Sequence, residues 1–86
     1  MGLAERAAIA RTKYETVKID YSAANAAVES VKLEIIEACQ DVNKYRWIVT
    51  LAARILEKEA VADLQWRRSN FYGVRCDLAE DAARRS

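Results

Sequence analysis

The fold is decided by residues 3–45, which read LAERAAIARTKYETVKIDYSAANAAVESVKLEIIEACQDVNKY. Apolar or small residues recur in this stretch at alternating spacings of four and three, over six heptads without a gap. Their positions are Leu3, Ala7, Ala10, Tyr14, Val17, Tyr21, Ala24, Val28, Val31, Ile35, Ala38, Val42 and Tyr45. A row that repeats every 3.5 residues stays on one face of an α-helix, and another helix covers such a seam best. We therefore predict a first helix over about residues 3–40.

One site within this stretch allows a different chain path. Asp20 and Ser22 are good N-cap residues, so a break near Asp20–Ser22 would give a three-helix bundle. Tyr21, Ala24 and Val28 nevertheless keep the heptad phase across the site, and a turn would normally shift that phase. We favour the uninterrupted helix and keep the three-helix bundle as the alternative.

The second half of the chain begins after a polar segment, Gln40–Asn43, at the midpoint of the sequence. We expect a turn over about residues 41–44 and a second helix over about 45–70. Gly73 favours a break, and Asp77 followed by Glu80 resembles a capping pattern, so a short last helix over about 77–84 is expected.

Two apolar stripes run along the second helix. One contains Val49, Ala53, Leu56, Ala60 and Leu64, and the other contains Ile48, Leu51 or Ala52, Ile55, Ala62 and Trp66. A helix with so wide an apolar arc usually contacts more than one neighbour. The fold class is therefore all-α: a single helical domain, residues 1–86, forming a long, coiled-coil-like antiparallel hairpin. Two such hairpins are expected to pair into a four-helix bundle, with the second stripe hidden between them.

Self-association is expected from the pattern of the first helix. Its middle carries small or slender residues that let two backbones approach, and its flank carries basic residues early and acidic residues late. The residues concerned are Ala23, Ala24, Ala27, Val28, Arg6, Lys13, Glu34 and Asp41. Against an antiparallel second copy, Arg6 would face Asp41 and Lys13 would face Glu34, so we predict a homodimer.

A second candidate surface is the densest cluster of aromatic and basic side chains. It contains Trp66, Arg67, Arg68, Phe71, Tyr72 and Arg75. Arginines beside aromatic rings can anchor a protein interface or stack on nucleic-acid bases. A net charge of +1 argues against a chain built chiefly to neutralise phosphate backbones. We therefore expect a protein partner here, with nucleic acid as the less favoured alternative.

Catalytic and metal-binding residues are scarce. The chain has no histidine, and Cys39 and Cys76 stand alone, so neither a Ser-His nor a Cys-His pair can form. We predict no enzyme activity, no cofactor, no metal site and no small-molecule substrate. The apolar run Trp47–Ala53 is far shorter than the ~20 residues of a membrane span, so no membrane partner is expected and a cytoplasmic location is the default.

The function expected from the sequence is a non-catalytic, self-associating helical module for protein–protein interaction. A small adaptor, a chaperone-like protein, an inhibitor or an assembly component would fit this description. The alternatives are a nucleic-acid-binding helical bundle that uses residues 66–75 and a purely structural homo-oligomer.

Overall fold

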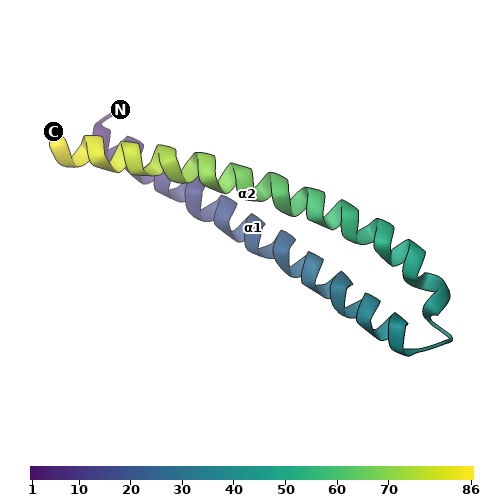
Figure 1. The fold of residues 1–86 in the computed structure, drawn as a ribbon. Coiled ribbons are helices and arrows are strands. Elements are labelled where there is room, and N and C mark those ends of the chain that lie inside the picture. The colour runs from purple at the N-terminus through teal and green to yellow at the C-terminus, as the bar shows by residue number, and fades with distance from the viewer. The chain divides into compact units, whose positions relative to one another are not determined.

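The computed structural model describes every residue from Met1 to Ser86. Helix α1 spans Leu3–Gln40 and helix α2 spans Ile48–Arg85, each with 38 residues, and a short 3-10 helix, η1, occupies Tyr45–Trp47 between them. There are no strands, and α2 returns along α1 after the turn (Figure 1). The prediction of an all-α antiparallel helical hairpin is confirmed, whereas the four-helix bundle stays a prediction.

The chain divides into two compact units. The first unit combines Met1–Tyr21 with Gln65–Ser86, and the second contains Ser22–Leu64 with the turn. In each unit a segment of α1 packs against a segment of α2. Neither helix contains an apolar stretch of the length that a membrane span requires.

The alternative with a helix break near Asp20–Ser22 is wrong, because α1 continues through these residues. Asp20 and Ser22 are exposed, whereas Tyr21 between them is half-buried on the seam. The two capping residues therefore project away from the packed face, where they do not interrupt the helix.

The heptad pattern of α1 identifies its covered face. Every seam position from Ala7 to Ala38 is buried or half-buried, and the most deeply buried are Val17, Val28, Val31 and Ala38. The predicted seam is wrong at its two ends, because Leu3, Val42 and Tyr45 are exposed. Val42 and Tyr45 lie beyond the last residue of α1, so the helical spacing no longer applies to them.

Helix α2 presents a seam that the apolar pattern only partly reveals. Its covered positions also follow spacings of three and four residues, with one gap of seven where Lys58 is exposed: Ile48, Leu51, Ile55, Ala62, Gln65, Ser69, Tyr72, Cys76, Ala79 and Ala83. The stripe expected to be hidden by a second hairpin therefore faces α1 within its own chain, although Trp66 is exposed. The stripe that begins at Val49 points outward instead.

The turn after α1 forms without glycine or proline. Asp41 accepts a hydrogen bond from the backbone N–H of Asn43 at its side-chain Oδ1 (2.9 Å) and one from Lys44 at its backbone oxygen (3.0 Å). Such a local side-chain bond replaces a backbone turn bond. The predicted turn over 41–44 is confirmed, but α2 begins at Ile48 because η1 comes first.

The predicted gap between residues 70 and 77 is wrong, since α2 runs without interruption to Arg85. Gly73 keeps an ordinary helical φ and acts through its lack of a side chain. A Cβ at this position would lie 3.2 Å from Cε1 of Tyr14, whose ring is flanked by Arg11 and Lys18. Glycine here leaves room for the tyrosine ring of α1.

Replacing Gly73 with valine is expected to destabilise the first unit. The added atoms must displace the Tyr14 ring, and overpacking of this kind costs about 1–3 kcal/mol of unfolding free energy. Urea denaturation followed by circular dichroism measures the change. Gly2→Val is the matched control, because a Cβ at Gly2 meets nothing within 4 Å. Equal stability of the two variants would show that Tyr14 does not need this space.

Candidate functional site

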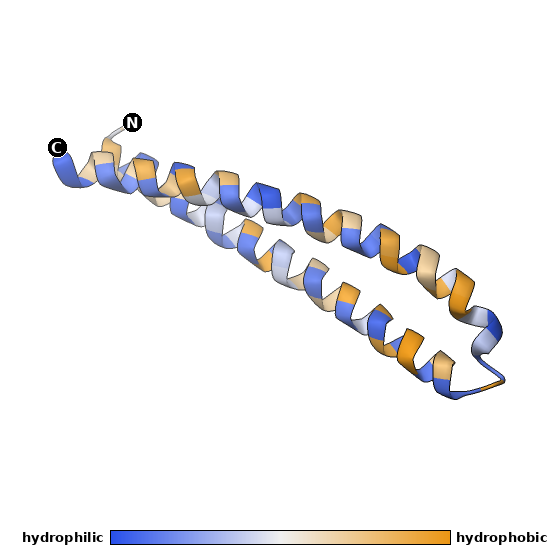
Figure 2. Ribbon diagram, in the orientation of Figure 1, coloured by the Kyte–Doolittle hydropathy of each residue, from blue (hydrophilic) through white to orange (hydrophobic).

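The largest candidate surface is the outward face of α2, which we call the outer stripe. In the second unit it contains Val49, Ala53, Leu56, Ala60 and Leu64, and in the first unit it continues with Phe71, Val74, Leu78 and Ala82. Its six large side chains are between 55% and 81% exposed. Hydrophobic residues accordingly recur along α2 among hydrophilic ones (Figure 2).

The balance between covered and exposed apolar groups is unusual. Only six hydrophobic residues are buried, whereas seventeen large hydrophobic residues are exposed. The chain exposes 6428 Å². A folded monomer of 9.7 kDa exposes about 5,100 Å². The excess exceeds the roughly 800 Å² that each partner buries in a standard protein–protein interface.

The predicted partner-binding cluster is spread around α2. Trp66 and Phe71 are both about half exposed, but five residues of helix separate them by about 140° around the axis. Phe71 packs edge-on against Tyr72 with ring centroids 5.3 Å apart, and the Arg75 guanidinium lies 5.6 Å from the Phe71 ring centre. Phe71, Tyr72 and Arg75 therefore form one group that does not include Trp66.

The other two arginines of the cluster lie near this group. Arg68 donates a hydrogen bond to Gln65 Oε1 (2.9 Å), and Arg67 lies one turn before Phe71 on the exposed side of α2. Their exposure is compatible with either a protein or a nucleic-acid partner.

The predicted self-association residues of α1 divide between the seam and the surface. Val28 is buried, Ala24 and Ala27 are half-buried, and Ala23 is exposed. Because α2 of the same chain already covers Val28, a second copy could contact α1 only through Ala23 and its exposed neighbours. The predicted homodimer through α1 stays a prediction.

The charged residues expected to bind a second copy have different surroundings. Arg54 donates a hydrogen bond to Glu34 (3.1 Å) within the second unit, and Asp41 caps the turn. Arg6 and Lys13 both line a cavity of the first unit.

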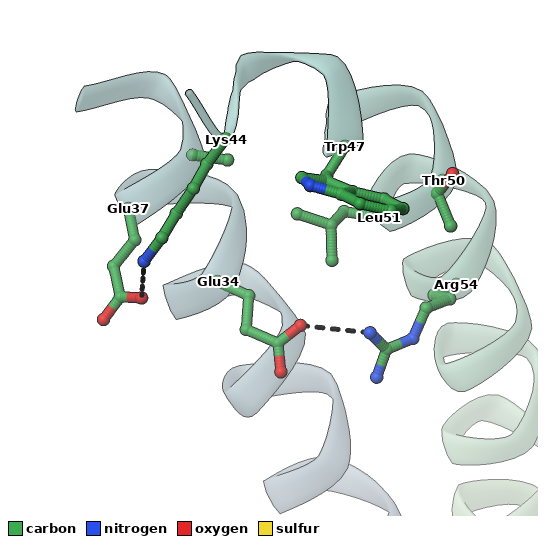
Figure 3. Close-up of a pocket in the computed structure, with 8 residues that line it drawn as sticks. Glu34, Glu37, Lys44, Trp47, Thr50, Leu51 and Arg54 are labelled. Atoms are coloured by element: carbon green, nitrogen blue, oxygen red, sulfur yellow. Dashed lines mark hydrogen bonds and ion pairs between the residues drawn. The ribbon is translucent and has the colours of Figure 1, made fainter. Parts of the chain in front are cut away.

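A cavity of about 430 Å³ lies beside the turn of the second unit. Buried Ala38 and Leu51 line it, with the Trp47 indole beside Leu51 (Figure 3). Two ion pairs border it, Glu34 with Arg54 at 3.1 Å and Glu37 with Lys44 at 4.0 Å. Because each acid already has a base beside it, the cavity offers an apolar surface and no uncompensated charge.

A second cavity of about 430 Å³ lies in the first unit and has a different electrostatic character. Arg6 and Lys13 of α1 and Arg75 of α2 line it, with no acidic residue among the lining side chains. Ile9 and Tyr72 are among the residues that supply its apolar surface. We call this the basic cavity. It joins two groups that the sequence suggested separately, the early charges of α1 and the aromatic-basic cluster of α2.

A network of hydrogen bonds and ion pairs connects the two helices of the first unit. Arg11 contacts Glu80 Oε1 from Nε and Nη2 at 2.8 and 2.7 Å, and the thiol of fully buried Cys76 donates to the same oxygen at 3.4 Å. Arg11 also pairs with Glu15 at 3.3 Å. The Arg11 hydrogen bond lowers the pKa of Glu80, and burial is the main reason that the pKa of Cys76 is raised. Neither shift produces a nucleophile, because it is the thiolate that reacts.

The structure contains no group of three or more metal-ligating side chains. The thiols are both free: Cys39 is exposed in the second unit and Cys76 is buried in the first. The outer stripe offers apolar contact to a binding partner, and the basic cavity offers positive charge.

The site geometry and fold together define a class, that of all-α helical hairpins with an exposed apolar helix face. Comparison with protein-family models, with curated proteins and with solved structures finds no match to this chain.

Acid titration should reveal the Arg11–Glu80 contact. Because the pKa of Glu80 lies below its ordinary 4.5 in the folded chain, its stabilising contribution is present above pH 4.5 and is lost as the pH falls through the lowered value. We expect the unfolding free energy of the wild type to fall more steeply below this pH than that of Glu80→Gln. Urea denaturation at a series of pH values measures both slopes, with exposed Glu5→Gln as control. Parallel curves for wild type and Glu80→Gln would contradict the assignment.

Proposed function

We propose that this protein is a non-catalytic, self-associating helical module for protein–protein interaction. The observation that carries the proposal is the outer stripe, whose large apolar side chains lie exposed along α2 on the side away from α1. Exposed apolar surface of this kind marks protein interaction sites. An adaptor, a chaperone-like protein, an inhibitor or an assembly component, acting in the cytoplasm, fits the proposal.

Charge along α2 supports a second copy of the chain as one partner. In the second unit the outer stripe is flanked by acidic residues, among them Glu57 and Glu59. In the first unit Arg68 and Arg75 flank it on the same side as Glu57, and Asp77 and Asp81 flank it on the other side. An antiparallel pair of α2 helices places the acidic half of one copy against the basic half of the other, and the opposite arrangement would place like charges together.

Side-chain size supports the same antiparallel arrangement. When the two copies are aligned about a point between Gln65 and Trp66, Ala60 of one faces Phe71 of the other, and Ala53 faces Leu78. Small residues opposite large ones allow close packing. This alignment places Arg75 opposite Leu56, directly beside Glu57, so that a Glu57–Arg75 pair forms twice, once on each side of the twofold axis.

The sequence-based alternative of nucleic-acid binding keeps one supporting observation, the exposure of Arg68 and Phe71 near Arg75 on α2. Binding of this kind would weaken by roughly 0.7–0.9 log units per phosphate contact for each log unit of salt. A flat salt response of RNA or DNA binding would remove it. A purely structural homo-oligomer is the remaining alternative, distinguished by self-association without any heterologous partner.

Charge reversal tests the α2 pairing. Glu57→Arg alone and Arg75→Glu alone each place like charges together, so each is expected to raise the dissociation constant of the homodimer about tenfold. A mixture of the two variants restores opposite charges at both pairs and should recover the dimer. Light scattering over a dilution series at low salt measures the mass, relative to the 9.7 kDa monomer.

Lys13→Glu serves as the comparison, because Lys13 would act in a dimer formed through α1. Loss of the dimer in Lys13→Glu with no effect of Glu57→Arg would assign self-association to α1 and reject the α2 pairing. A wild type that is monomeric throughout, with no protein partner sensitive to Leu56→Ser, would reject the proposed function itself.

A further inference from the structure

The basic cavity of the first unit gathers cations that have no acidic partner in the chain. Arg6, Lys13 and Arg75 form no ion pair, and the Arg75 guanidinium lies over the Phe71 ring. Arg11, by contrast, lies on the same helix between Arg6 and Lys13 and binds two glutamates. Within a single chain, the charge of Arg11 is therefore compensated, whereas the charges of Arg6, Lys13 and Arg75 around the cavity are not.

Like charges around one cavity repel each other, and a bound anion relieves the repulsion. A monocarboxylate carries a single charge and is satisfied by one arginine. A phosphate monoester carries about −1.5 to −2 charges at neutral pH and three acceptor oxygens, which match three separate donors better. Arginine is also suited to phosphate because its guanidinium donates two parallel hydrogen bonds.

The rest of the cavity indicates that the ligand is more than a bare ion. Its volume of about 430 Å³ lies within the range of small-molecule sites. Ile9 and Ala10 of α1 and Tyr72 of α2 supply apolar and aromatic wall. A ligand with an apolar or aromatic group attached to the phosphate would cover this wall while the phosphoryl oxygens contact the cations.

We propose that the basic cavity binds an organic phosphate, with Arg6, Lys13 and Arg75 holding the phosphoryl group and Ile9 and Tyr72 contacting its organic part. The proposal goes beyond the interaction module, because a single chain contains the whole site. It also goes beyond the sequence, which led us to expect no small-molecule substrate and which separates Lys13 from Arg75 by more than half of the chain.

Titration with phenyl phosphate, inorganic phosphate and benzoate tests the proposal, using NMR shifts of the wild-type chain. We expect phenyl phosphate to bind more tightly than either of the other two, because it alone carries both the dianion and the ring. Lys13→Gln and Arg6→Gln should each weaken its binding about tenfold. Lys58→Gln is the matched control, since it removes the same charge from an exposed site in the second unit.

Each alternative outcome overturns a stated part of the proposal. Absence of phenyl phosphate binding, or equal weakening by Lys58→Gln and Lys13→Gln, would reject the site. Equal binding of benzoate would reject the phosphate assignment. A short phosphotyrosine peptide distinguishes the sources: binding equal to that of phenyl phosphate supports a phosphorylated partner segment, and binding of the free ester alone supports a metabolite. A monomeric wild type leaves the proposal standing, so its failure is distinct from that of the interaction module.

Discussion

The contact between the seams of α1 and α2 is the constraint on which the rest of the structure depends. On α1 the buried seam residues are three valines and an alanine, and on α2 the covered positions include Gln65 and Ser69. Small side chains let the helices approach closely, but they remove little apolar area from water. Since burial contributes about 25 cal/mol per Å², such a core stabilises a chain of this size only modestly.

A thin core has a direct consequence for the outer surface. Large apolar residues such as Leu56, Phe71 and Leu78 lie on the outer face of α2 and are not covered by α1. The ion pairs cannot offset this, because pairs as exposed as Glu34 with Arg54 contribute little stability and mainly fix which parts of the helices meet. The apolar area that would stabilise the fold further is on its exterior, where only another molecule can cover it. The same feature therefore limits stability and supports the interaction function.

The sequence predicted those parts of the fold that depend on local pattern. The unbroken heptads gave the seam of α1 and the continuity of the helix past Asp20, and the polar segment gave the turn at Asp41. The seam of α2 was only partly recognised, because Gln65 and Ser69 interrupt its apolar pattern while the outward stripe at Val49 follows a clearer one. Hydropathy alone therefore does not identify which of the two stripes of α2 faces α1.

Features that depend on contacts between distant residues could not be predicted from the sequence, for a different reason. Gly73 suggested a break because its local property is flexibility, whereas its role depends on Tyr14, which lies far away in the chain. The basic cavity likewise depends on which turn of α1 faces Arg75. Only the pairing of the two helices supplies this information.

The position of Arg75 follows from two different periods on one helix. The seam of α2 repeats every seven residues, whereas Val49, Ala60, Phe71 and Ala82 on the outer stripe repeat every eleven. Around a straight α-helix of 3.6 residues per turn, a seven-residue repeat drifts about 20° per heptad in one direction, and an eleven-residue repeat, at about 3.67 residues per turn, drifts about 20° per repeat in the opposite direction. Over the five heptads from Ile48 to Ala83 the seam therefore moves by about 100°, and from Val49 to Ala82 the outer stripe moves by about 60° in the opposite direction.

This drift brings one flank of the outer stripe toward the seam at the C-terminal end of α2. Glu57 and Arg75 lie on the same flank, five helical turns apart. Arg75 is close to the covered positions Tyr72 and Ala79, and with them it lines the basic cavity beside α1. Glu57, nearer the start of α2, is fully on the outer side. The unequal periods thus explain why a residue flanking the apolar face also reaches the cavity in the first unit.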